Sequence, residues 1–284
     1  MNIRLHENGW TVYVEDLDLN NITQEEINII GNYLITNIVV VIRGQKLTPQ
    51  DECRIMHMFG NVENSIEVEH KEPWKHFFIP DTNAELIRVT GELDEHGEPG
   101  MFSHVTDLDW HCNRPAHENR FPIVWLYSVK GSKGSRTSYS NGVLAYRDLD
   151  EHFLNEIKDL KMICGFKQGG YTEINFGKAE DFNEHYTPNI IHTNQVNGEK
   201  CIFFPYLQFK HFVGMTPEET MPLLEKIRDY MLQEKYLYHH DWEDGDVLIA
   251  EQWQSLHKRW AFDGIATRRL HRGVCDFAKI QFNQ

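Results

Sequence analysis

The most constraining feature of the sequence is a series of short apolar runs, separated by turn-forming residues, that begins near residue 84 and continues to residue 277. Runs this short are typical of β-strands, and their irregular spacing favours a sandwich or barrel over alternating strands and helices. We therefore expect a mainly β fold with flanking helices. The expected strands are 85–90, 122–129, 161–167, 200–204, 246–250 and 268–277.

Other segments carry signals for helices and for further strands. Residues 23–37 and 216–235 both open with a Thr followed three residues later by Glu, which is the capping-box pattern of a helix start. Residues 48–60 open with a Thr followed by proline, which suits the first helical position. The β-branched run 38–42 predicts a buried strand. Residues 236–240 (YLYHH) could form a metal cluster, but their alternation favours a strand with one core face.

No internal repeat and no Pro/Ser-rich linker divides the chain, so we expect a single domain over residues 1–284. Residues 91–108 and 169–188 read as long loops. Long loops in a compact domain are usually lids or binding loops.

Charge and composition narrow the possible partners. Lys and Arg number 28 and Asp and Glu 43, so the net charge is −15, which argues against binding nucleic acid or an anionic membrane surface. The longest apolar run, residues 38–42, is far shorter than the ~20 residues of a membrane helix. Five cysteines without a Cys-x-x-Cys pair favour a reducing, cytoplasmic location. A small-molecule substrate is the expected partner, and a homo-oligomer is left open.

Two segments carry the residues expected to do chemistry. The first contains Trp110, His111 and Asn113; the second runs over residues 242–250 and is followed by His257. Non-haem iron oxygenases hold Fe(II) with two His and one carboxylate, and leave positions open for co-substrate and O₂. Ligands two residues apart on a strand point to the same side. A buried Arg beyond such a site can bind a carboxylate with two parallel hydrogen bonds.

The motifs resemble those of the taurine dioxygenase/TfdA-like family of Fe(II)- and 2-oxoglutarate-dependent dioxygenases. The resemblance covers most of the chain, and its C-terminal motifs are the most specific part. The matching features are Arg43-Gly44-Gln45, Trp110-His111-x-Asn113, Gly134-Ser135-Arg136-Thr137, Trp242-x-x-Gly245-Asp246, and His257 followed 11 and 15 residues later by Arg268 and Arg272.

The resemblance implies a double-stranded β-helix, or jelly roll, and a set of site residues. His111 and His257 would be the two iron-binding histidines, with Asn113 at the third ligand position. Arg268 and Thr137 would bind the distal carboxylate of 2-oxoglutarate. The implied cofactors are Fe(II), 2-oxoglutarate and O₂.

The implied reaction is the oxidation, by hydroxylation, of a small anionic substrate such as a sulfonate or carboxylate, with release of succinate and CO₂. Arg272 would meet the anionic group of that substrate. The iron would supply the oxidative chemistry, and the protein would supply orientation and electrostatics.

Asn113 departs from the family, which has Asp at this position. In one interpretation Asn113 is a weak, neutral third ligand of an active oxygenase. In a second, the carboxylate of Asp109 or Glu251 compensates for the missing charge. In a third, the protein has lost oxygenase activity and serves as a metal-binding, small-acid-binding or regulatory protein.

Overall fold

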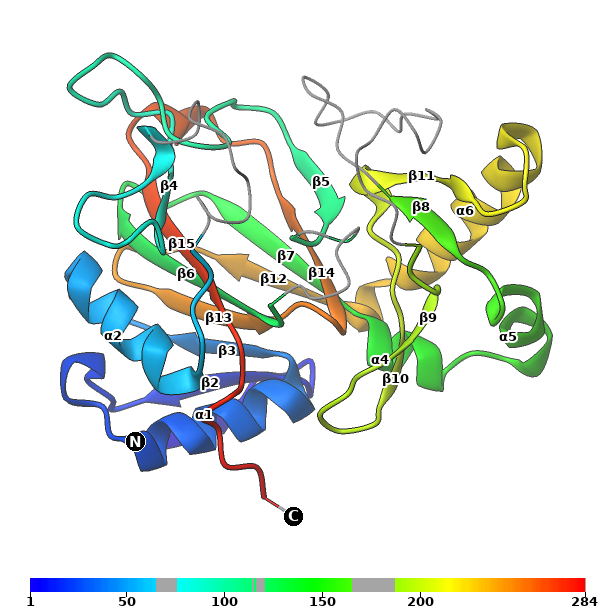
Figure 1. The fold of residues 1–284 in the computed structure, drawn as a ribbon, viewed down its shortest axis with the longest axis horizontal. Coiled ribbons are helices and arrows are strands. Elements are labelled where there is room, and N and C mark those ends of the chain that lie inside the picture. The colour runs from blue at the N-terminus through cyan, green and yellow to red at the C-terminus, as the bar shows by residue number, and fades with distance from the viewer. Residues whose placement is uncertain (65–75, 114, 116–120, 165–186, 284) are drawn as a thin grey trace.

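The computed structural model describes residues 1–64, 76–113, 115, 121–164 and 187–283, and it is mainly β with flanking helices (Figure 1). Within these ranges, no helix combines the length and apolarity needed to cross a membrane. A seven-stranded sheet has the order β1 (Asn2–Leu5), β2 (Thr11–Glu15), β3 (Val39–Ile42), β13 (Val247–Glu251), β6 (Ile123–Lys130), β15 (Arg269–Cys275) and β4 (Ile87–Val89).

A second, four-stranded sheet carries most of the residues that the sequence singled out. Its order is β12 (Leu237–Asp241), β7 (Arg136–Asn141), β14 (Ser255–Arg259) and β5 (Leu108–His111). All neighbouring strands in the two sheets are antiparallel except β2 and β3. Two short pairs complete the strands: β9 (Ile191–Thr193) with β10 (Lys200–Ile202), and β8 (Met162–Cys164) with β11 (Phe209–Phe212).

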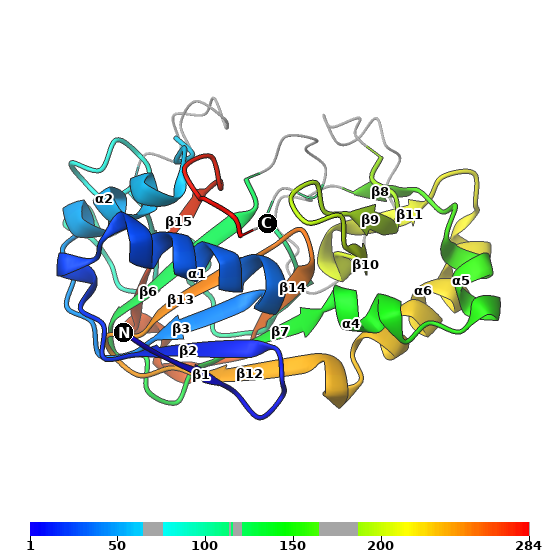
Figure 2. The same cartoon turned by 90° about the horizontal axis from the view of Figure 1, so that it is seen from below.

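The run 38–42 is apolar throughout because the sheet is covered on both faces. Val39 and Val41 belong to the apolar cluster that the large sheet shares with the four-stranded sheet, whereas Val40 and Ile42 belong to a second cluster. That second cluster is closed by α1 (Gln24–Asn37) and α2 (Pro49–Phe59), and Figure 2 shows α1 lying across the outer face. Strands covered on both faces have no polar side.

The predicted helix starts are confirmed. Thr23, Thr48 and Thr216 each accept a hydrogen bond from a first-turn amide, and each start is a full capping box. The third helix, α6 (Pro217–Met231), ends earlier than the predicted residue 235, because the chain turns at 234–236 to enter β12. In β12, Tyr238 and His240 are buried and His239 is not, which confirms the predicted alternation.

Each of the six expected strand segments contains a strand, namely β4, β6, β8, β10, β13 and β15. The sequence analysis did not anticipate α4 (Gly142–Arg147), α5 (Glu151–Ile157) or the strands β1, β2, β7, β9, β11 and β14. Residues 91–107 contain no named strand or helix, in agreement with the expected loop. Residues 169–186 of the other expected loop lie outside the described residues.

The elements α4, α5, α6 and β8 to β11 form a group beside the two sheets (Figure 1). Their apolar side chains belong to the same cluster as the inner face of the large sheet. That shared cluster includes Phe153, Ile157, Leu224 and Ile227 with Leu248 and Leu256.

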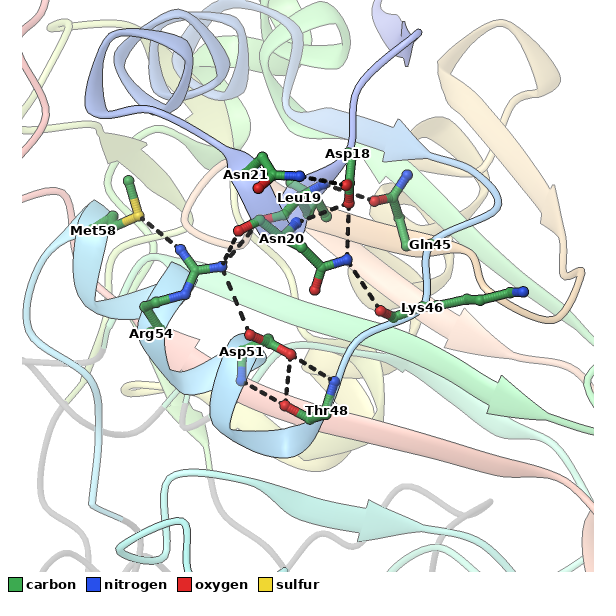
Figure 3. Close-up of polar contacts among 10 residues, drawn as sticks. All are labelled: Asp18, Leu19, Asn20, Asn21, Gln45, Lys46, Thr48, Asp51, Arg54 and Met58. Carbon is green, nitrogen blue, oxygen red and sulfur yellow. Dashed lines mark hydrogen bonds and ion pairs between the residues drawn. The ribbon is translucent and has the colours of Figure 1, made fainter.

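The Arg43-Gly44-Gln45 turn fastens the start of the chain to the large sheet. The Gln45 side chain accepts a hydrogen bond from the Leu19 amide (2.9 Å) and donates to the carbonyls of Leu17 and Arg43. Arg54 of α2 donates to the carbonyls of Leu19 (3.2 Å) and Asn20 (3.1 Å), as Figure 3 shows. The side-chain amide of Gln45 and the guanidinium of Arg54 therefore form hydrogen bonds with backbone groups of residues 17–20, a segment that does not belong to a sheet.

Gly245 lies where two turns meet. Its φ is +87°, and its carbonyl accepts a hydrogen bond from the Gln45 amide at 2.7 Å. A Cβ at this position would lie 2.8 Å from the Gln45 carbonyl oxygen. Gly134 has nearly the same φ, +88°, but a Cβ there would meet only the Phe262 ring at 3.8 Å.

We therefore expect Gly245→Ala to destabilise the protein more than Gly134→Ala. Both variants incur the left-handed strain of about 1–2 kcal/mol. Only Gly245→Ala adds a backbone collision, so its total loss should exceed that of Gly134→Ala by at least about 1 kcal/mol. The measurement is the free energy of unfolding in denaturant. Equal losses in the two variants would contradict the tight approach of these turns.

Candidate active site

The imidazoles of His111 and His257 face each other between two neighbouring strands. His111 on β5 is paired directly with His257 on β14, and the ring centroids are 4.1 Å apart. The two histidines singled out from the sequence, 146 positions apart, therefore come together in the four-stranded sheet.

Both rings are held in the neutral form. Burial lowers the pKa of His111 to about 4 and that of His257 well below its usual value, and the nearby Arg272 charge adds to both effects. His111 Nδ1 lies 2.6 Å from the carbonyl oxygen of Asp109, which can only accept a hydrogen bond. Nδ1 therefore carries the proton, and the Nε2 lone pair is left for a metal.

Asn113 lies at the end of the same segment, oriented by Arg272. The Asn113 Oδ1 accepts a hydrogen bond from Arg272 Nη1 at 3.2 Å. Because a guanidinium can only donate, the amide oxygen must be the atom that faces Arg272. The Asn113 Nδ2 is buried and has no hydrogen-bond partner among the described residues.

Two buried glutamines hold the backbone of this segment. Gln208 donates to the Cys112 carbonyl at 2.6 Å and accepts from the Cys112 amide at 3.4 Å. Gln252 accepts from the Asn113 amide at 2.9 Å. The sequence analysis assigned no role to Gln208 or Gln252, because neither residue carries a local signal for these backbone contacts.

Arg268 is a buried cation with unsatisfied donors. Its residue exposure is 1%, and Nε and Nη1 have no hydrogen-bond partner among the described residues. Burial and then the Arg259 charge lower its pKa to about 9, so it remains charged at neutral pH. A buried charge of this kind needs an anion.

Thr137 is linked to the surroundings of Arg268 by its strand partner, Arg259. Thr137 on β7 is paired with Arg259 on β14, and the Arg259 charge acts on Arg268. The Thr137 hydroxyl accepts a hydrogen bond from Trp242 Nε1 at 2.9 Å, so its own hydrogen can be donated to a ligand.

Neither proposed substitute carboxylate joins the histidines. Asp109 was expected on the His111 face, but the β5–β14 register shifts between Leu108 and His111, and strict alternation fails there. Its carboxylate lies 3.5 Å from Lys258 Nζ. The Glu251 carboxylate accepts hydrogen bonds from two backbone amides of the following turn.

Within the described ranges, no set of three His, Cys, Asp or Glu side chains could hold a metal. The donors present fit a metal bound by two neutral imidazoles and the Asn113 amide oxygen. As the described side chains lie, neither Asp109 nor Glu251 completes a metal-binding set with the two histidines. The Asp109 charge nevertheless acts on His111, so the compensation interpretation stays a prediction.

A buried pair of neutral histidines, together with a buried guanidinium whose donors lack partners among the described residues, suits an oxygenase that binds a metal and a keto acid. A sequence model of the family described as "Taurine catabolism dioxygenase TauD, TfdA family" matches residues 7–274. The chain belongs to this family, whose dioxygenases use Fe(II), 2-oxoglutarate and O₂.

Individual relatives agree with this assignment. The chain is 23% identical to an alpha-ketoglutarate-dependent 2,4-dichlorophenoxyacetate dioxygenase of Burkholderia sp. (strain RASC), over 88% of this chain and 85% of the relative. It is 28% identical to a pentalenolactone F synthase of Streptomyces arenae, over 86% and 84%. The fold matches the crystal structure of AAD-2 in complex with Mn(II) and N-oxalylglycine, with a TM-score of 0.76, 18% identity and 96% of each chain covered.

We predict that Asn113→Asp binds Fe(II) about tenfold more tightly or better, because a carboxylate adds a negative charge where the amide has none. Asn113→Ala should bind Fe(II) more weakly than the unmodified protein, since it removes the oxygen altogether. Anaerobic titration at fixed pH measures both. Weaker binding by Asn113→Asp would indicate a nearby carboxylate instead, and unchanged binding by Asn113→Ala would remove Asn113 from the ligand set.

Proposed function

We propose that this dioxygenase hydroxylates a small anionic substrate, such as a carboxylate or sulfonate, and releases succinate and CO₂. The observation that carries the proposal is that two guanidinium groups act on the histidine pair and that one of them also acts on the buried Arg268. Arg272 and Arg259 are close enough to lower the pKa of His111, and Arg259 also acts on Arg268. This cationic interior belongs to a chain of net charge −15, so it is a local specialisation for anions.

His111, His257 and Asn113 are the residues that would hold Fe(II). The His111 Nε2 lone pair and the neutral form of both rings support this role. Bound Fe(II), together with 2-oxoglutarate, supplies the activation of O₂ that oxidises a C–H bond. The protein's own contribution is to keep both imidazoles unprotonated, to orient His111 through the Asp109 carbonyl, and to hold the backbone of Cys112 and Asn113 through the two glutamines.

Arg268 is the proposed anchor of 2-oxoglutarate, with the Thr137 hydroxyl as a second donor. The buried Nε and Nη1 donors suit the two oxygens of a carboxylate. The charge is already desolvated in the protein, so a carboxylate gains an interaction that water does not weaken.

Arg272 is the proposed contact for the anionic group of the substrate. It donates to Asn113 and acts on both histidines, so an anion beside Arg272 would lie close to the metal. Relatives named for 2,4-dichlorophenoxyacetate and (S)-phenoxypropionate, both carboxylates, support an acidic substrate.

The two facing sheets are proposed to be the double-stranded β-helix of the family, and residues 1–284 to be one domain. Support comes from the apolar cluster that joins the inner face of the large sheet to the four-stranded sheet and to α6.

The function is tested by measuring succinate with Fe(II), 2-oxoglutarate and O₂ across matched substrates. Small aryloxy and aliphatic carboxylates and sulfonates should raise succinate formation above the substrate-free rate and yield hydroxylated product. Their neutral amides should not, because they present no negative charge to Arg272. Equal stimulation by acids and amides would contradict the anionic substrate class.

For Arg268 we expect loss of 2-oxoglutarate binding on replacement by Ala, by about 100-fold or more, since a carboxylate would face a pocket without its cation. Arg268→Lys should recover little, because the planar fork is lost. Calorimetric titration into the Mn(II)-loaded protein measures this. The control is Arg269→Ala, whose guanidinium pairs with Glu92 at 2.6 Å near the surface and which should bind normally. Normal affinity in Arg268→Ala would move the anchor elsewhere.

A further inference from the structure

A row of aromatic side chains crosses the whole four-stranded sheet and starts at the histidine pair. His111, His257, Tyr139 and Tyr238 are successive cross-strand partners on β5, β14, β7 and β12. The Tyr139 ring stacks on His257 with centroids 5.9 Å apart and planes at 28°. The Tyr139 and Tyr238 rings follow at 6.5 Å. Aromatic contacts of this spacing therefore connect the candidate metal site to the opposite edge of the sheet.

The far end of the row has a built-in proton acceptor. The Tyr238 hydroxyl lies 3.0 Å from His240 Nδ1, and His240 Nε2 lies 3.2 Å from Asp246 Oδ2. All three residues are at most 2% exposed. The Asp246 carboxylate is also held by Arg43 at 2.9 Å. Although Nε2 makes no well-aligned hydrogen bond among the described residues, a carboxylate oxygen at this distance favours a proton on Nε2, which leaves Nδ1 to accept from Tyr238.

Tyr139, in the middle of the row, differs from Tyr238 in this respect. Its hydroxyl is buried and has no hydrogen-bond partner among the described residues. A phenol loses an electron readily only when its proton has somewhere to go. The Tyr139 ring can therefore relay an electron, whereas Tyr238 can hold the resulting radical because its proton has an acceptor.

We propose that Tyr139 and Tyr238 form an electron-transfer path that removes an oxidising equivalent from the metal site when no substrate is bound. The inference rests on the proposed function, because O₂ and 2-oxoglutarate must leave a strong one-electron oxidant at that site. One electron passes from Tyr238 through the Tyr139 ring to the oxidant, which is thereby reduced by one electron. The phenolic proton of Tyr238 moves to His240 Nδ1. The products are a neutral Tyr238 radical and a protonated His240 beside Asp246.

The path continues to the surface through Tyr13. The Tyr13 hydroxyl lies 2.8 Å from that of Tyr238, and its ring is partly exposed between Arg4 and Arg43. A one-electron reductant in solution, such as ascorbate, can restore the path from there. The oxidation is thereby kept away from the metal-binding histidines.

The experiment uses the full chain with Fe(II) and 2-oxoglutarate, mixed with O₂ in the absence of substrate and frozen at intervals. Electron paramagnetic resonance should show a tyrosyl radical, and succinate is measured in the same samples. Tyr238→Phe should abolish the signal, and His240→Gln should weaken it because the proton acceptor is altered. Tyr139→Phe should slow its appearance.

Tyr236→Phe is the matched control. Tyr236 is equally buried and lies two residues from Tyr238, but its hydroxyl bonds to Asp148 and its ring is outside the row. The radical should persist in this variant. Succinate formation without any radical, or a radical unchanged in Tyr238→Phe, would overturn the path while leaving the proposed function intact.

Absence of succinate would count against the proposed function. In that case a second measurement tests the role of Tyr238 separately. The metal-free protein is oxidised with azidyl radicals generated by pulse radiolysis, and tyrosyl absorption is followed. A long-lived tyrosyl radical in the unmodified protein and in Tyr236→Phe, but not in Tyr238→Phe, supports Tyr238 as the place where oxidation settles. Equal decay in all three proteins overturns the proposal.

Discussion

The direct pairing of His111 with His257 across β5 and β14 is the contact on which the remainder of the site depends. Backbone pairing sets how closely the rings approach, and burial between the sheets keeps them unprotonated. The ligand-bearing strand is short, and its last residues are held by Gln208 and Gln252 instead of by a further strand. A metal placed here would therefore meet donors whose orientation is fixed before binding.

The buried guanidinium groups of the candidate site contrast with the net negative charge of the chain. In this chain of net charge −15, Arg268 has buried donors without hydrogen-bond partners among the described residues. The nearby Arg259 donates from Nη1 and Nη2 to backbone carbonyls of the 102–106 segment, and only its Nε has no partner within the described part of the chain. Arg259 thus contributes charge and rigidity, whereas Arg268 is available for a ligand. With Asn in place of Asp at position 113, the candidate site carries one negative charge fewer, which increases the attraction of this region for anions.

The sequence was sufficient for features that depend on local pattern, and insufficient where tertiary contacts decide. The capping boxes at Thr23 and Thr216 and the doubly covered strand β3 were predictable, and motif spacing placed His111 and His257. The strands β7 and β14 were missed because they consist largely of polar residues whose burial depends on partners far along the chain. The register shift between β5 and β14, and the backbone contacts made by Gln208, leave no local signal at all.

The contacts of Gln252 have a consequence for how this protein can diversify. Its side chain accepts from the Asn113 amide and donates to the Phe121 carbonyl, so one buried residue fastens both ends of the intervening segment. Loop length adds little to the cost of closing a chain once its ends are fixed. Sequence changes beyond Asn113 can therefore occur while Gln252 still holds the Asn113 amide. Mutation can in this way explore new substrates on one side of the anchor while selection maintains the metal geometry on the other.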